Sequence, residues 1–221
     1  RNKVESKSTV KPICISPIKI NTPLVEDTQS AWDILGKIED ECIVDGRAVL
    51  PFKGGESEGI NRLRHYLEGS HAIETYKITR NGLVGERYST KFSPWLAMGC
   101  LSPRLIYHEI KKYEKKYIAN ESTYWVIFEL LWREYFIWMM KKHPHHFFKV
   151  NGISKHQALH PKKDEVLLKQ WIEGKTKSDF VNANMIELKL TGFMSNRGRQ
   201  NVASYLCHDL NIDWRYGAAY F

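Results

Sequence analysis

Residues 125–138 bring charged and aromatic side chains together at helical spacing. Trp125, Glu129, Trp132 and Arg133 fall on one side of a helix that is apolar nearly all round. We therefore expect this helix to be buried, with Glu129 and Arg133 as an i,i+4 ion pair in apolar surroundings. The pair is either a structural feature of the core or part of a cavity wall where an aromatic ring and charged groups meet a flat polar ligand.

A second group of polar side chains lies in residues 88–95, which read Tyr-Ser-Thr-Lys-Phe-Ser-Pro-Trp. Ser93 followed by Pro94 predicts a helix start, because the Ser oxygen caps a free N–H and Pro suits the first turn. Ser102 and Pro103 repeat the pattern. Hydroxyls, a lysine and a helix N-terminus together suit a pyrophosphate. The alternative interpretation is an ordinary capped helix without a ligand.

A third group lies in residues 191–201. Ser195 is expected to cap a helix that continues through Leu206, which places Arg197 and Arg199 in its first turns. Two cations are unfavourable at the positive end of a helix, so we expect anionic partners for them, either a buried carboxylate or a phosphate. A solvated run of charges is the alternative.

The elements that must position these groups are predicted to be helices. Residues 1–56 are rich in Lys, Pro and Ser and indicate a linker, with a short amphipathic helix around residues 31–38. From about residue 57 onward, apolar residues such as Ile60 and Leu63 recur at helical spacing, and no strand alternation is found. We therefore predict an all-α domain over residues 57–221, with irregular connectivity.

The composition limits the class of protein. Lys and Arg number 33 against 25 Asp and Glu, and the resulting net charge of +8 favours polyanionic partners. The four cysteines are far apart, which argues against a zinc site or a disulfide framework and favours a reducing compartment. His143, His145 and His146 lack neighbouring Cys, Asp or Glu ligands, so no metal site is expected.

The sequence contains no apolar run long enough for a membrane span and no apolar secretory core at its start. We therefore expect a soluble intracellular protein of the nucleus, the cytoplasm or an organelle. The first residue is Arg1 rather than Met, so the chain is expected to be a piece of a longer protein.

These stretches, in this order, resemble the photolyase/cryptochrome family and specifically its DASH-type cryptochromes. The resemblance covers residues 57–221, and the basic stretch before them is similar to the interdomain connector of that family. It implies the helical FAD-binding domain, incomplete at its C-terminal end and without the N-terminal Rossmann-like antenna domain. The stretches of sequence that carry the resemblance are residues 79–83, 88–104, 129–133, 191–206 and 212–215.

The resemblance also assigns roles, since proteins of this family hold a U-shaped FAD inside the helical domain. The positions that match FAD contacts are Tyr76, Ser89, Thr90, Lys91, Phe92, Ser93, Glu129, Arg133, Asn196 and Arg199. The positions that match contacts to damaged, single-stranded DNA are Arg80, Glu129, Trp132, Arg133 and Asn196. Catalytic positions are Glu129 as hydrogen-bond partner of the flipped lesion, Trp132 as its stacking ring, and Trp214 as the middle tryptophan of an electron-transfer chain.

The sequence departs from the family pattern in several places. It stops at Phe221, before the aspartate pair, the residue facing flavin N5 and the innermost tryptophan. Lys177, Asp179 and Asn182 replace residues of a Gly-x-Thr-Gly-x-Pro-x-x-Asp-Ala segment, and the outermost tryptophan before Trp171 is not evident. We therefore expect the chain alone to hold FAD weakly, and a second chain supplying the missing helices or the antenna domain is a candidate partner.

The function implied by the resemblance is FAD-dependent, light-driven repair of cyclobutane pyrimidine dimers, blue-light reception, or both. Two alternatives keep the fold without the flavin. In one, the basic face makes the chain a light-independent nucleic-acid-binding module. In the other, a decayed photolyase half is a structural subunit of a larger assembly.

Overall fold

The computed structural model describes residues 45–154 and 161–221. The helix predicted around residues 31–38, and most of the predicted linker, lie outside these ranges. Within them the chain is helical, and the only strand-like feature is an isolated parallel bridge between Lys162 and Ile212. The prediction of an all-α fold is confirmed. None of the described helices is long and apolar enough to span a bilayer.

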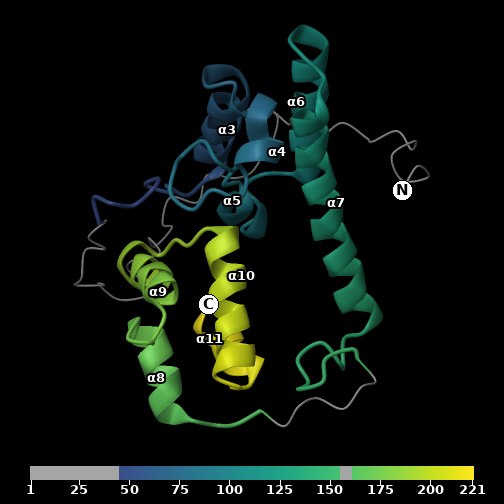
Figure 1. Cartoon of the computed structure of the whole chain (residues 1–221). Coiled ribbons are helices and arrows are strands. Elements are labelled where there is room, and N and C mark those ends of the chain that lie inside the picture. The colour runs from purple at the N-terminus through teal and green to yellow at the C-terminus, as the bar shows by residue number, and fades with distance from the viewer. Residues whose placement is uncertain (1–44, 155–160) are drawn as a thin grey trace, which may run out of the picture.

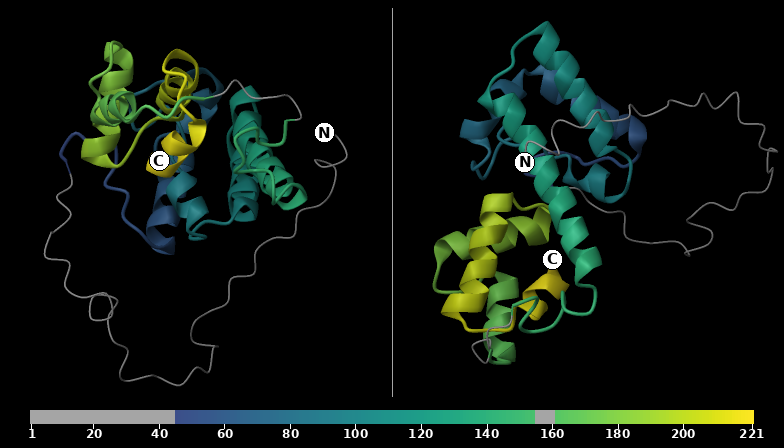
Figure 2. Two further views of the ribbon diagram at one scale, coloured as in Figure 1. Left: turned by 90° about the horizontal axis from the view of Figure 1, so that it is seen from below. Right: turned by 90° about the vertical axis from the view of Figure 1, so that its right-hand side faces the viewer.

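The helices form two groups, which Figure 1 shows as α3–α7 and α8–α11. In Figure 1 and in the right view of Figure 2, α7 extends out of the first group and runs past the second. The first group comprises α3 (Glu56–Arg64), a π-helical turn (His65–Gly69), a 3-10 turn (Ala72–Thr75), α4 (Tyr76–Thr79), α5 (Ser93–Ala97), α6 (Pro103–Lys116) and α7 (Glu121–Lys142). The second comprises α8 (Glu165–Glu173), α9 (Asp179–Thr191), α10 (Asn196–Ser204), a π-helical turn (Tyr205–Asp209) and α11 (Trp214–Tyr220).

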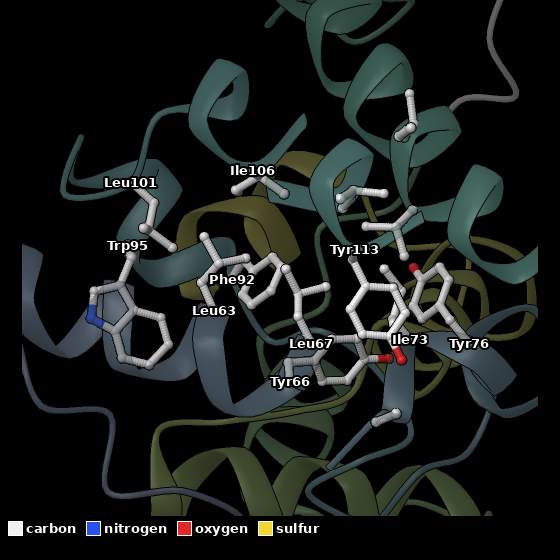
Figure 3. Close-up of a cluster of buried hydrophobic side chains, with 14 residues drawn as sticks. Leu63, Tyr66, Leu67, Ile73, Tyr76, Phe92, Trp95, Leu101, Ile106 and Tyr113 are labelled. Carbon is white, nitrogen blue, oxygen red and sulfur yellow. The ribbon is translucent and has the colours of Figure 1, made fainter. Parts of the chain in front are cut away.

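The core of the first group is built from apolar faces at helical spacing. In α6, Ile106, Ile110 and Tyr113 follow one another at i, i+4 and i+7 and are fully buried. They meet Leu63 of α3 and Tyr66 of the π-helical turn that follows it, and Figure 3 shows these rings and branched chains converging. This core holds the loop between α4 and α5, because Phe92 at the end of that loop is inserted into it.

Helix α7 begins at a capping box, in which Asn120 Oδ1 accepts from the backbone N–H groups of Ser122 (2.8 Å) and Thr123 (3.0 Å). Only its first two turns are buried, through residues such as Val126 and Ile127. The prediction that the whole helix is buried is wrong. An apolar sequence does not show what covers it, and in the described chain several rings of the last turns stay exposed: Trp132, Tyr135, Phe136 and Trp138.

The second group packs around Trp171, which is fully buried and donates from its Nε1 to the carbonyl of Val202 at 3.0 Å. The predicted start of α10 is confirmed, because Ser195 Oγ accepts from the backbone N–H of Gly198 at 3.0 Å. Helices α9 and α10 approach closely at Gly198, and a Cβ there would lie 2.1 Å from Asn184 Oδ1.

We predict that Gly198→Ala lowers the free energy of unfolding by about 1–3 kcal/mol, because the added methyl group overlaps the buried Asn184 side chain. Chemical denaturation followed by circular dichroism measures the change. Gly54→Ala is the matched control, since nothing lies within 4 Å of its Cβ position and its effect should stay within about 0.5 kcal/mol. Equal stabilities of the two variants would contradict the close approach of α9 and α10.

Candidate functional site

Two buried cations hold the loop between α4 and α5 from inside. Arg62, on α3, donates to the carbonyls of Glu86 (2.8 Å), Ser89 (3.5 Å) and Thr90 (3.1 Å), and forms an ion pair with the Glu86 carboxylate at 2.9 Å. Lys91 donates from Nζ to the Gly85 carbonyl at 2.6 Å, and to the Glu86 carbonyl and Ser89 Oγ at 3.4 Å each. Both cations are only 6% exposed, so their charges are compensated by the loop itself.

The backbone of this loop leaves donors free. In a trans peptide the N–H points opposite to the preceding carbonyl, so inward carbonyls at Gly85, Glu86, Ser89 and Thr90 turn the following N–H groups away from the cations. Within residues 45–154 and 161–221, none of the four N–H groups makes a hydrogen bond. They belong to Glu86, Arg87, Thr90 and Lys91. A row of unpaired backbone donors suits an anion.

The expected serine caps differ from the structure. Phe92, not Ser93, occupies the cap position of α5, and no side chain caps this helix. Phe92 is 2% exposed and meets Tyr66 edge to face, with ring centres 5.8 Å apart. With Phe92 buried in the core, helix α5 begins one residue earlier than predicted. Ser102 does occupy the cap position of α6 with Pro103 at N1, but its side chain makes no cap bond. Helix α5 has only five residues, which leaves the loop rather than a helix end as the anion site.

Helices α4 and α7 meet in a cluster of charged and aromatic side chains. Arg80 donates to Glu129 Oε1 at 2.5 Å, and the Trp125 indole N–H donates to the same oxygen at 3.1 Å. The cations of Lys77 and Arg80 lie 5.0 and 5.3 Å from the centre of the Trp125 ring. Tyr76 lies beside this cluster, and its burial, with Glu129 nearby, raises the pKa of its hydroxyl to about 12.

The predicted ion pair between Glu129 and Arg133 is wrong. Arg133 pairs with Glu134 at 2.7 Å and also reaches the carbonyl of Leu96 at 3.5 Å. The spacing along α7 permitted the pair, but tertiary packing brings Arg80 to Glu129 from another helix. The spacing of residues along α7 does not show that Arg80 competes with Arg133 for Glu129.

Trp132 lies one turn after Glu129 on α7 and is 44% exposed. It stacks on Phe136 with ring centres 5.8 Å apart, and Tyr135 meets it edge to face at 5.5 Å. An exposed indole supported by other rings offers a flat surface to a base or a flavin.

The remaining predicted residues lie in the second group of helices. Asn196 is exposed at the start of α10, and Arg197 donates to Asn81 Oδ1 at 2.7 Å. Arg199 is half-buried and lies 4.6 Å from the centre of the Phe221 ring, and no carboxylate pairs with it in the described part of the chain. Trp214 donates from Nε1 to the carbonyl of Val150 at 3.1 Å, and no interaction joins it to the other predicted residues within those ranges.

The structure therefore brings some predicted residues together and leaves others apart. Tyr76, Arg80 and Glu129 share the cluster between α4 and α7. The loop reaches the second group through Lys91, whose ammonium lies 5.7 Å from the Phe193 ring centre. Arg62 was not predicted as a site residue. It is a basic residue beside apolar positions of α3, and this sequence pattern does not indicate its contacts with three loop carbonyls.

The buried state of Lys91 has a consequence for pH. Burial, opposed by Glu86 and Glu187 and reinforced by Arg62, lowers the pKa of its ammonium from 10.5 to about 8. Between these values the unfolded chain binds more protons than the folded one, so the Lys91 contribution to stability rises with pH. We predict that wild type gains stability relative to Lys91→Met from pH 8 to 10, by at most about 1.4 kcal/mol per pH unit. Urea denaturation at constant ionic strength measures this, and a constant or falling difference would exclude the depressed pKa.

Comparisons with known proteins identify the relatives of this chain. The family described as the FAD binding domain of DNA photolyase matches residues 125–221. Cryptochrome DASH of Danio rerio is 50% identical over 227 residues, which cover all of this chain and 42% of the relative. Cryptochrome DASH of Synechocystis is 52% identical over 177 residues, or 80% of this chain and 36% of the relative. The chain thus spans less than half of the length of these relatives.

Solved structures show the same likeness. A cryptochrome from Synechocystis aligns with a TM-score of 0.79 and 51% identity, over 82% of this chain and 38% of the other. A class III photolyase from Agrobacterium tumefaciens aligns with a TM-score of 0.66 and 29% identity, over 76% and 34%. The chain belongs to the cryptochrome/photolyase family, in its DASH type, and carries part of the helical FAD-binding domain of that family.

Proposed function

We propose that the chain binds FAD and takes part in light-driven repair of cyclobutane pyrimidine dimers in single-stranded DNA. The observation that carries the proposal is the pairing, on one helix, of the Glu129 carboxylate with the exposed Trp132 ring. A flipped base needs a polar group at its edge and a flat apolar surface at its face, and α7 offers both within one turn.

The residues present fit a flavin dinucleotide. The unpaired N–H groups of the loop suit its diphosphate, and Tyr76 and the loop residues Ser89, Thr90, Lys91, Phe92 and Ser93 follow the family pattern for this cofactor. FAD, when bound, supplies the light-excited electron that splits the dimer. A photolyase from Sulfolobus tokodaii, which aligns with a TM-score of 0.58 and 26% identity, was solved with two FAD molecules and supports this assignment.

The contacts to the lesion follow from the cluster between α4 and α7. Glu129 Oε1 is occupied by Arg80 and Trp125, whereas Oε2 makes no hydrogen bond in the part of the chain that is described, and it is free to accept from a base N–H. The Trp132 ring supports the face of the same base. Arg80 and Lys77 are about one-third exposed, which lets them neutralise a nearby DNA phosphate.

The proposal is tested on the 221-residue protein itself. Titration with FAD should give saturable quenching of flavin fluorescence, and blue light should then remove dimers from a single-stranded thymine-dimer oligonucleotide. Chromatography of the oligonucleotide counts the dimers, with a dark sample as control. Flavin binding without repair would favour a blue-light receptor, and DNA binding without flavin would favour a light-independent module. Either result would overturn the proposed function.

We predict that Trp132→Ala weakens binding of the thymine-dimer oligonucleotide by about 1–3 kcal/mol, because a base-stacking surface is lost. Fluorescence anisotropy of the labelled oligonucleotide measures the affinity. Trp138→Ala is the matched control: this tryptophan is also exposed on α7, but its ring lies 4.7 Å from the Lys141 ammonium and away from Glu129. Equal losses in both variants would argue against a specific role for Trp132.

Arg199 provides a separate test of the flavin. Its burial lowers the pKa of the guanidinium, and no carboxylate pairs with it in the described ranges. We predict that Arg199→Gln weakens FAD binding and lowers the free energy of unfolding, because a half-buried cation with a ring contact to Phe221 is removed. The flavin titration and urea denaturation measure the two effects. Unchanged values in both would identify Arg199 as a solvated charge.

A further inference from the structure

We infer that Arg62 and Lys91 are positioning residues for the diphosphate of the flavin: together they form an inner clip that gives the loop of residues 85–91 its anion-binding shape. The inference rests on the proposed binding of FAD and assigns it a support that lies beneath the loop. Neither side chain needs to touch the cofactor to fulfil this role.

The donors of the clip are almost fully used by the loop. An ammonium has three N–H groups, and Lys91 Nζ has three acceptors in Gly85, Glu86 and Ser89. Four of the five guanidinium N–H groups of Arg62 are matched by four acceptors in Glu86, Ser89 and Thr90. In this conformation Lys91 therefore has no donor left for a phosphate, and its contribution to an anion site acts through the backbone.

The clip determines the direction of the loop peptides. Because carbonyls at Gly85, Glu86, Ser89 and Thr90 point to the cations, the next N–H groups point away from them. Lys91 itself has a φ of 56°, the left-handed conformation that turns successive N–H groups to one side in anion-binding nests. Without the cations, nothing among the described contacts would hold these four carbonyls inward.

The cations also place the loop against both groups of helices. Arg62 comes from α3, whose neighbouring residue Leu63 is buried in the first core. Lys91 faces Phe193 just before α10, and Phe193 stacks on Phe52 at 5.3 Å. The clip therefore connects the loop to α3 on one side and to the segment before α10 on the other, and such support helps to orient a set of donors.

The test compares the 221-residue protein with Arg62→Met, Glu86→Gln and Arg64→Met. Arg64 lies two residues further along α3, is exposed, and has no ion pair in the described part of the chain, so its variant removes the same charge without touching the loop. Glu86→Gln keeps the backbone carbonyl that Arg62 binds and removes only the carboxylate charge. This variant tests the inference if Arg62→Met fails to fold. NMR order parameters of the backbone N–H groups of residues 85–92 and FAD titration are the two readouts.

We expect Arg62→Met to lower the order parameters of residues 85–92, while those of α6 and α9 stay unchanged, and to bind FAD about tenfold more weakly or worse. Glu86→Gln should show a smaller change in the same direction, and Arg64→Met should match the wild type. A loop that keeps its order parameters, or one that loosens without loss of FAD affinity, would overturn the inference. If the wild type binds no FAD, the proposed function fails, whereas the order parameters still decide whether the clip shapes the loop.

Discussion

The packing of the short helix α4 against the first turns of α7 determines where the charged groups of the site lie. Ser122 Oγ, in the first turn of α7, accepts the backbone N–H of Lys77 at 3.1 Å and so fixes the register of the two helices. From that register α4 directs Arg80 to Glu129 and lays its guanidinium over Trp125. The carboxylate thus has a charged partner and an indole donor, which offset its desolvation in an aromatic wall.

Helix α3 couples the core to the loop in a similar way. Leu63 of α3 and Leu67 of the π-helical turn that follows it pack into the core, whereas Arg62 lies under the loop and donates hydrogen bonds to three of its carbonyls. The binding surface is therefore supported by a helix whose position is fixed by apolar burial rather than by the ligand. A donor set held in this way loses little freedom when an anion arrives.

Local patterns in the sequence predicted two helix starts correctly, whereas the start of α5 differs by one residue. The cap at Ser195 and the Ser102-Pro103 start of α6 depend on neighbouring residues only, and both helices begin where the pattern placed them. The contacts of the site are long-range. Arg80 and Glu129 are 49 positions apart, and Arg62 and Glu86 are 24 apart, so helical spacing favoured the wrong partner for Glu129 and gave no sign of Arg62.

The segment that departs from the family pattern keeps an ordered turn with an amide in place of a carboxylate. Asn182 stands where the pattern has Asp, and its Oδ1 accepts from both the N–H and the hydroxyl of Thr176 at 2.7 Å. An amide also has donors, and Asn182 Nδ2 gives one to the carbonyl of Thr176 at 2.8 Å, a bond that a carboxylate cannot make. The substitution removes a charge and adds a hydrogen bond within the same turn. The turn leading into α9 is therefore specified by the oxygen that both residue types share.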